Sequence, residues 1–275
     1  MDWLDLWIMS HVNSLVNRWW IVDASAVETS YLVILTGGVL MAMFWWCWVE
    51  YGKDDPEKQT TLALTLFATV LTVFVSRALA YSLPYRERPI HDPRLHYHLA
   101  YTQDPSWLIH WSSFPSDHAA VYFCVAAGLW MVSRRLGIWA TAFAALISLP
   151  RVYLGFHFPT DILGGALVGI GVASLAKIAS LRSMARWVLN RSNRYPAYLY
   201  ACLFIFTFEI AEMFNSFQRI CFLGIQVCRR LPRTTLQLLA IPALLVLLMG
   251  VLAGLIWWKH RPMQEIGAPT VQHHV

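Results

Sequence analysis

The stretch IWATAFAALISLPRVYLGFHFPTDILGGALVGIGVASLAKIASL, residues 138–181, decides the fold class. It holds two apolar runs, 138–157 and 160–181, and each is about as long as the roughly 20 residues with which a helix crosses a bilayer. Only a short polar turn separates the runs. We therefore expect two antiparallel membrane helices that are joined at the membrane surface.

Further apolar runs of similar length lie on both sides of this pair. They cover residues 29–51, 60–83, 118–136, 198–217 and 235–258. We therefore predict an all-α fold, a polytopic membrane helix bundle with about six or seven transmembrane helices. Whether the run 198–217 crosses stays open, because its Glu209 and Glu212 are costly in hydrocarbon.

Composition also favours a membrane protein. Hydrophobic residues make up 57% of the 275 residues and charged residues 13%, whereas soluble domains carry about 25% charged residues. The net charge is +5, but the basic residues lie mainly between apolar runs, as in cytoplasmic loops. We expect a membrane environment and no nucleic-acid partner.

The N-terminal segment differs from the later runs. Apolar residues recur at helical spacing along 3–22, whereas Asp2, Asp5, Asn13 and Asn17 lie on the other side. This pattern predicts an amphipathic helix in the membrane interface. The segment lacks the basic start of a secretory signal, so we expect no cleavage here.

The basic residues predict the orientation. They follow the first, third and fifth apolar runs, so these loops are expected in the cytoplasm. Alternation then places the long loop 84–117 and the turn 157–161 on the outer side. The arginines of 218–234 disagree with this alternation. Either 198–217 does not cross, or 218–234 is an interfacial helix.

Three polar clusters lie at predicted helix ends on that outer side. They are Arg77 with Tyr85-Arg86-Glu87-Arg88-Pro89, then Phe114-Pro115-Ser116-Asp117-His118, and then the residues from Arg151 to Asp161. Arginine beside a bilayer needs an anionic partner, and the guanidinium fork suits phosphate. Ser116 opens a predicted helix, where free N–H groups favour an anion. Together the clusters predict a phosphate site.

Two histidines in these clusters suit phosphoryl transfer. His157 and Asp161 are four residues apart, so in a helical turn Asp161 would accept a hydrogen bond from one imidazole nitrogen. The other nitrogen would then be free to attack phosphorus. His118 lies in a separate cluster and is suited to be the acid.

The long loop holds four more histidines with irregular spacing, and we predict no metal site there. These residues are His91, His96, His98 and His110.

The three clusters resemble the tripartite signature of the type-2 phosphatidic acid phosphatase superfamily. That signature reads Lys-x6-Arg-Pro, then Pro-Ser-Gly-His, then Ser-Arg-x5-His-x3-Asp. This chain has Arg88-Pro89 in the first motif, Pro115, Ser116 and His118 in the second, and Arg151, His157 and Asp161 in the third. The resemblance covers roughly residues 30–180 and implies a helical membrane core.

This chain departs from the signature at three positions. Tyr81 stands where the family has its lysine, and we expect Arg77, one helical turn earlier, to replace that lysine. Asp117 stands in place of glycine. We expect its side chain to point away from the phosphate, which its backbone N–H would contact. Pro150 replaces a serine.

The resemblance implies a metal-independent phosphatase without a cofactor. His157 would attack phosphorus and form a phosphohistidine, Asp161 would orient His157, and His118 would protonate the leaving oxygen. The residues implied to bind the substrate phosphate are Arg77, Arg88, Ser116, Asp117 and Arg151. Arg86 is a further candidate, for contact with a second phosphate.

We therefore expect an integral membrane phosphatase that converts undecaprenyl diphosphate to undecaprenyl phosphate. The site would face the periplasm from a bacterial inner membrane. The alternative substrates are phosphatidylglycerophosphate, phosphatidate and lipid A. An alternative of another class is a non-enzymatic lipid-binding or transport protein, which would release no phosphate from any lipid phosphate.

The chain divides into two predicted parts. Residues 1–182 would form the phosphatase core, and 183–275 a C-terminal membrane extension with one or two further spans. Through this extension the protein would form a homo-oligomer or bind a partner.

Overall fold

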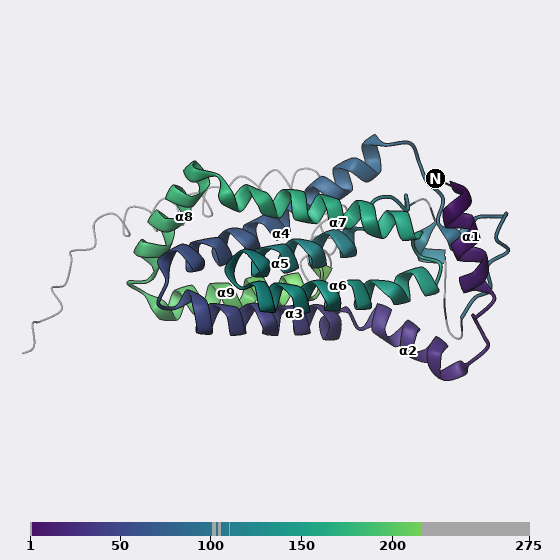
Figure 1. Cartoon of the computed structure of the whole chain (residues 1–275), viewed down its shortest axis with the longest axis horizontal. Helices are drawn as coiled ribbons and strands as arrows, with labels where there is room; N and C mark the ends of the chain where they lie inside the picture. The colour runs from purple at the N-terminus through teal and green to yellow at the C-terminus, as the bar shows by residue number, and fades with distance from the viewer. Residues whose placement is uncertain (1, 101–102, 104–105, 110, 216–275) are drawn as a thin grey trace, which may run out of the picture. The chain divides into compact units, whose positions relative to one another are not determined.

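The computed structural model describes residues 2–100, 103, 106–109 and 111–215, and all the regular structure in these ranges is helical (Figure 1). The all-α prediction is confirmed for this part of the chain. The longer helices are α1 Asp2–Asn13, α2 Trp20–Tyr31, α3 Val33–Cys47, α4 Pro56–Ser82, α5 Asp117–Val132, α6 Arg134–Tyr153, α7 Pro159–Ala173, α8 Ala179–Ser192 and α9 Pro196–Ala211. The short ones are a π-helical turn η1 Trp48–Gly52 and the 3-10 turns η2 Pro89–His91, η3 Ser106–Leu108 and η4 Ser174–Lys177.

Among the described residues, three helices are long and apolar enough to cross a membrane. These are α4, α6 and the continuous segment Pro159–Lys177, which joins α7 to η4. The helices α5 and α9 are apolar but shorter. The predicted run 235–258 lies outside the described residues, so the count of six or seven spans stays a prediction.

The N-terminal segment corrects one expectation. A single helix over 3–22 is wrong, because α1 ends at Asn13 and α2 begins at Trp20. The Asn13 amide donates to the carbonyl of Leu95 at 3.0 Å, and the Asn17 amide to the carbonyl of Leu99 at 2.9 Å. Asn17 also adopts a left-handed φ of 65°. Asparagine side chains that bind backbone elsewhere compete with helix continuation.

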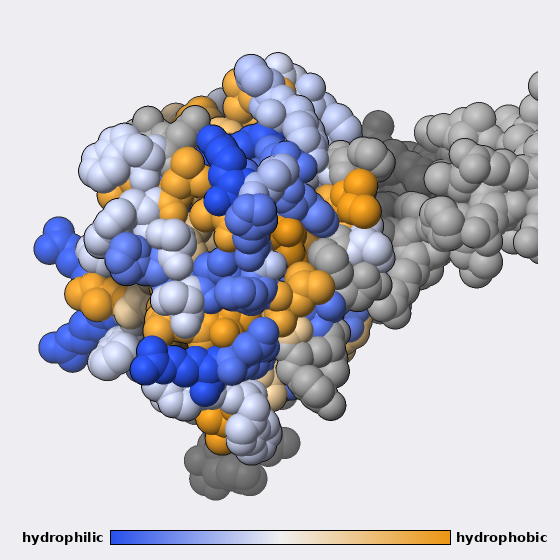
Figure 2. All heavy atoms as spheres, turned by 90° about the vertical axis from the view of Figure 1, so that its right-hand side faces the viewer, coloured by the Kyte–Doolittle hydropathy of each residue, from blue (hydrophilic) through white to orange (hydrophobic). Residues whose placement is uncertain are grey.

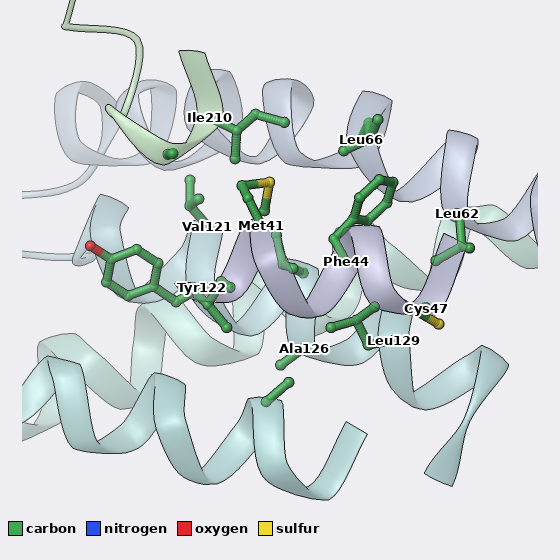
Figure 3. Packing of buried hydrophobic residues seen from close by; sticks show 14 of the residues in the cluster. Met41, Phe44, Cys47, Leu62, Leu66, Val121, Tyr122, Ala126, Leu129 and Ile210 are labelled. Atoms are coloured by element: carbon green, nitrogen blue, oxygen red, sulfur yellow. The ribbon is translucent and has the colours of Figure 1, made fainter. Parts of the chain in front are cut away.

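The core lies where α3, α4, α5 and α9 meet (Figure 3). Phe44 of α3, Leu66 of α4 and Leu129 of α5 are almost fully buried there. Alongside α3 lies α9, and the indole N–H of Trp45 donates to the Thr207 hydroxyl at 3.1 Å. The apolar run 198–217, whose crossing the sequence left open, thus packs against the bundle as α9.

Only residues 183–215 of the predicted C-terminal extension belong to the described part of the chain. Residues Met1–Phe217 form one compact unit, in which α8 contacts α4 and α9 contacts α3. Residues 216–275 lie outside the described part, as do the arginines of 218–234. The division at residue 182 and the partner role of the extension therefore stay predictions.

The polar clusters lie at one end of the bundle, where the ends of α4, α5, α6 and α7 meet. The C-terminal ends of α4 and α6 and the N-terminal ends of α5 and α7 meet there, beside α1 (Figure 1). Figure 2 views this end, and hydrophilic side chains gather across it. The fold therefore brings together residues that are up to about 150 positions apart in the sequence.

Candidate active site

Close packing of α5 on α7 joins the second and third clusters. A Cβ atom at Gly165 would lie 2.3 Å from the carbonyl oxygen of Ser116, and one at Gly169 would lie 2.1 Å from that of Ala120. Only glycine permits this approach. As a result, the N–H of Ser116 donates to the carbonyl of Asp161 at 3.1 Å.

His157 lies in the turn between α6 and α7 and is 3% exposed. Its Nδ1 is 2.8 Å from the carbonyl oxygen of Ser113. A carbonyl only accepts hydrogen bonds, so Nδ1 carries the proton. The lone pair is therefore on Nε2, which lies 3.4 Å from Nη1 of Arg88. This tautomer leaves Nε2 with the lone pair that a nucleophile needs.

Asp161 corrects the predicted histidine–carboxylate hydrogen bond. Its Oδ2 is 3.8 Å from His157 Nδ1, which is beyond hydrogen-bond distance. The physical reason is that Asp161 lies in the first turn of α7 and its carboxylate turns back to the N-terminus of the helix. Oδ2 accepts the N–H of Phe158 at 2.7 Å and the hydroxyl of Ser113. Asp161 thus holds His157 indirectly, through Ser113.

The surroundings keep His157 neutral. Burial and the neighbouring Arg88 lower its pKa below the ordinary value of 6.5, because both disfavour a charged imidazole. Asp161 acts on the pKa in the opposite direction. The net lowering favours the form with a free lone pair, which attack on phosphorus requires.

His118 has a different partner. Its Nδ1 lies 2.8 Å from Oδ1 of Asp117, and its backbone N–H donates to the same oxygen at 2.8 Å. The other oxygen of Asp117 lies 3.3 Å from Nη2 of Arg77. We expected the Asp117 side chain to point away from the site, and this is wrong. The carboxylate lies within the site, between a histidine and an arginine that both attract it.

Arg77 lies in the same cluster, at the end of α4. Its guanidinium is 5.1 Å from the centre of the Trp111 ring, in a cation–π contact. Tyr81, which aligns with the family's lysine, is 79% exposed. The chain therefore has Arg77 as the cation beside His118 and Asp117. Its contact with phosphate stays a prediction.

Arg88 and Arg151 are the two buried cations of the site, at 9% and 6% exposure. Within the described residues, neither lies within 4.0 Å of a carboxylate. Arg88 donates instead to the carbonyl of Phe156 at 2.7 Å, and Arg151 to that of Ser30 at 3.4 Å. Buried charges are normally paired, so these two guanidinium groups are suited to bind an anion such as phosphate.

Ser116 and Arg86 are both engaged by protein groups. Ser116 is fully buried as the N-cap of α5, and its hydroxyl accepts the N–H of Ala119 at 3.4 Å. Arg86 donates to Asp161 and to Asp5, each at 2.6 Å. Arg86 therefore binds two carboxylates of the protein, and not a second phosphate as predicted.

Sequence reasoning missed Ser113 and Asp5. Ser113 holds His157 through its carbonyl and Asp161 through its hydroxyl. Its position just before the second motif was the only signal. Asp5 belongs to α1, far from all three motifs, and the sequence gives no sign that it reaches them.

In the described ranges, no three His, Cys, Asp or Glu side chains are grouped as a metal ion would need. His98 lies against Asn13, with its backbone N–H donating to the Asn13 side chain at 2.7 Å. His110 lies outside the described residues.

The central part of the chain is similar to known proteins. The family model of the PAP2 superfamily matches residues 61–185, which include all three clusters. Over these residues the chain is similar to the PAP2 superfamily. Together with the apolar helices, this match identifies the chain as an integral membrane protein.

Two PAP2 relatives and one solved structure are similar to the chain. YbjG of Escherichia coli, provisionally named an undecaprenyl-diphosphatase, is 30% identical over 139 residues, which is 50% of this chain and 63% of that protein, or less than two thirds of its length. The undecaprenyl-diphosphatase BcrC of Bacillus subtilis is 24% identical over 61% of this chain and 76% of that protein. The crystal structure of Aquifex aeolicus LpxE is 25% identical and covers 63% of this chain and 94% of that one, with a TM-score of 0.45.

Proposed function

We propose that this protein is a membrane phosphatase that hydrolyses undecaprenyl diphosphate to undecaprenyl phosphate through a phosphohistidine on His157. The observation that carries the proposal is a neutral, buried imidazole in the same site as two buried arginines, neither of which has a carboxylate within 4.0 Å in the described part of the chain. The unprotonated Nε2 of His157 accepts a hydrogen bond from Nη1 of Arg88 at 3.4 Å. A nucleophile beside buried guanidinium groups that can bind phosphoryl oxygens is what phosphoryl transfer needs.

The first step forms the phosphoenzyme. Nε2 of His157 attacks the terminal phosphorus, and the bond from that phosphorus to the bridging oxygen breaks. His118 donates a proton to the leaving oxygen, and undecaprenyl phosphate departs. Arg88 and Arg151 stabilise the negative charge on the phosphoryl oxygens, with the helix N-terminus at Ser116 as a further donor.

The second step restores the enzyme. His118, now unprotonated, takes a proton from water as the oxygen attacks the phosphorus. The phosphorus–nitrogen bond breaks, inorganic phosphate leaves, and His157 keeps its lone pair. The scheme uses no metal ion, because the arginines supply the positive charge.

The substrate proposal rests on the relatives and on the position of the site. Two similar proteins from different bacteria carry the name undecaprenyl-diphosphatase. The site lies where α4 to α7 end, so a lipid tail beside the bundle can place its phosphates there. Basic residues follow the opposite helix ends, which supports a periplasmic site in a bacterial inner membrane.

A phosphate-release assay tests the proposal. The full chain is purified in detergent and given undecaprenyl diphosphate, phosphatidylglycerophosphate, phosphatidate and lipid A, each with and without EDTA. We expect the fastest release from undecaprenyl diphosphate, unchanged by EDTA, and none from His157→Ala. Acid-labile labelling of the wild type by substrate carrying a labelled terminal phosphate would report the phosphohistidine.

The other outcomes lead to different functions. Faster release from lipid A would favour that substrate, and a lipid A 4'-phosphatase of Bacteroides thetaiotaomicron is 41% identical to this chain over 58 residues. Equal release by His157→Ala would overturn the histidine nucleophile. No release from any lipid phosphate would favour the lipid-binding or transport alternative.

A further inference from the structure

Asp5 is a buried carboxylate that the proposed chemistry does not use. It lies in α1, outside the residues matched by the PAP2 model, and it is 1% exposed. One of its oxygens accepts from Nη2 of Arg86 at 2.6 Å and from the hydroxyl of Thr160. The other lies 3.3 Å from the backbone nitrogen of Thr160, which donates to it. The α1 helix is thereby tied to the first turn of α7.

Arg86 also connects Asp5 to Asp161. Its Nη1 donates to Oδ1 of Asp161 at 2.6 Å, and to the Thr160 hydroxyl at 2.8 Å. The guanidinium also lies over the ring of Phe158, 4.3 Å from its centre. One arginine thus bridges two carboxylates that are both almost fully buried, at 1% and 0% side-chain exposure.

Asp161 is consequently held at both oxygens. Arg86 binds Oδ1, whereas the N–H of Phe158 and the hydroxyl of Ser113 bind Oδ2. The carbonyl of that same serine fixes the proton of His157. A continuous series of hydrogen bonds therefore runs from α1 to the imidazole.

We propose that Asp5 and Arg86 are positioning residues for the nucleophile, acting on His157 through Asp161 and Ser113. The inference rests on the proposed phosphatase function. Neither residue touches the phosphate site, because their polar atoms are turned to each other, to Thr160 and to Asp161. Their loss should therefore lower kcat and leave KM nearly unchanged.

The expected size follows from the role. Partners that orient a functional side chain typically change activity by about 10- to 100-fold when they are removed. Asp5→Asn keeps the shape of the side chain but removes the charge that holds Arg86. Arg86→Gln leaves one buried oxygen of Asp161 without its donor. The two changes break the same series, so their effects should not multiply.

A matched control lies in the same cavity. Asp92 is 5% exposed and pairs with Arg94 at 2.6 Å. It lines, together with Asp5 and Arg86, a cavity of about 400 Å³. The carboxylate of Asp92 hydrogen-bonds Arg94 in its own loop, and none of these hydrogen bonds reaches Asp161. Asp92→Asn removes a buried charge from the same place and should leave kcat unchanged.

The experiment measures kcat, KM and thermal midpoint with undecaprenyl diphosphate in detergent. The variants are Asp5→Asn, Arg86→Gln, Arg86→Lys, the Asp5→Asn/Arg86→Gln double variant and Asp92→Asn. We expect a fall in kcat of about 10- to 100-fold in the first two. KM should stay within about twofold, and the double variant should match the worse single variant. Arg86→Lys, which keeps the charge and should fold even where Arg86→Gln does not, should recover part of kcat.

The results separate this inference from the function on which it rests. Release by the wild type with undiminished kcat in Asp5→Asn and Arg86→Gln alike overturns the inference alone. If the falls in kcat multiply in the double variant, the inference is also overturned. An equal fall in kcat in Asp92→Asn overturns it as well, because either result indicates a general loss of packing. No release by the wild type overturns the proposed function, and the inference with it.

Discussion

The two histidines of the site differ in what holds Nδ1. His157 donates to a backbone carbonyl at 2.8 Å, with the nearest carboxylate at 3.8 Å. His118 lies 2.8 Å from a carboxylate, that of the preceding residue. Both imidazoles are therefore fixed in orientation, with Nε2 as the remaining nitrogen. Only His118 has a full negative charge in direct contact.

This difference supports the proposed division of roles. A carboxylate at Nδ1 stabilises a charged imidazole against the cost of burying that charge, and a proton donor must carry the charge. A carbonyl gives the orientation without that charge. Arg88 beside His157 further disfavours a second positive charge. His157 is therefore suited to attack and His118 to protonate.

The largest expected effect is the difference between a His157 variant and a His118 variant on two substrates with different leaving groups. His157→Asn should abolish release from every substrate, by about 10⁴-fold or more, because no phosphoenzyme forms. His118→Asn should lose about 10²- to 10⁴-fold on undecaprenyl diphosphate. With p-nitrophenyl phosphate, whose leaving oxygen needs little protonation, only the His118 variant should regain activity. The measurement is initial rates on both substrates.

The wild type serves as the control for each substrate. Recovery of His157→Asn on p-nitrophenyl phosphate would reverse the assignment. Equal loss in both variants on both substrates would mean that the two histidines act as one unit and not in separate roles.

The carboxylate at His118 gives the next largest effect. Asp117→Asn keeps an acceptor oxygen but removes the charge, and we expect kcat on undecaprenyl diphosphate to fall about 10- to 100-fold. Asp117→Gly restores the family's usual residue but loses the contacts to His118 and Arg77, so it should fall at least as far. Steady-state kinetics on both variants checks this. A glycine variant as fast as the wild type would show that the His118 contact contributes nothing.

The sequence predicted the helices and the three polar clusters, because these depend on local pattern. Apolar runs located α4 to α7 within a few residues, and the spacing from Arg151 to Asp161 located the third cluster. The contacts that decide the roles are not local. Ser113 and His157 are 44 residues apart, and Asp5 and Arg86 are 81 apart. No spacing rule reports such pairs.

Two errors at short range have a physical cause as well. The x3 spacing suggested a direct bond from His157 to Asp161, but α7 starts at Pro159, so the two residues do not share a helical turn. The prediction that the Asp117 side chain points away considered only the repulsion between its carboxylate and a phosphate. The stronger attraction of the adjacent imidazole and of Arg77 decides its direction.

The close approach of α5 and α7 should matter for both histidines at once. Gly169→Ala places a methyl group 2.1 Å from the carbonyl oxygen of Ala120, so the helices must separate. We expect a loss of about 1–3 kcal/mol in stability and about a tenfold fall in kcat. Gly171→Ala is the control, because a Cβ there meets nothing within 4 Å. Thermal unfolding and release rates measure both, and equal behaviour of the two variants would contradict the role given to this contact.

The pH profile gives the smallest effect and tests the nucleophile directly. His157 must be neutral to attack, and burial and Arg88 lower its pKa from 6.5. Protonation therefore begins only at a pH below that value, and the acid limb of kcat/KM should lie below about pH 6.5. Arg88→Gln removes one of the two causes, so the limb should move upward by up to about one unit, besides the loss of phosphate binding. Arg88→Lys keeps the charge and should keep the limb in place. An acid limb that stays fixed in Arg88→Gln would mean that the group titrating there is not His157.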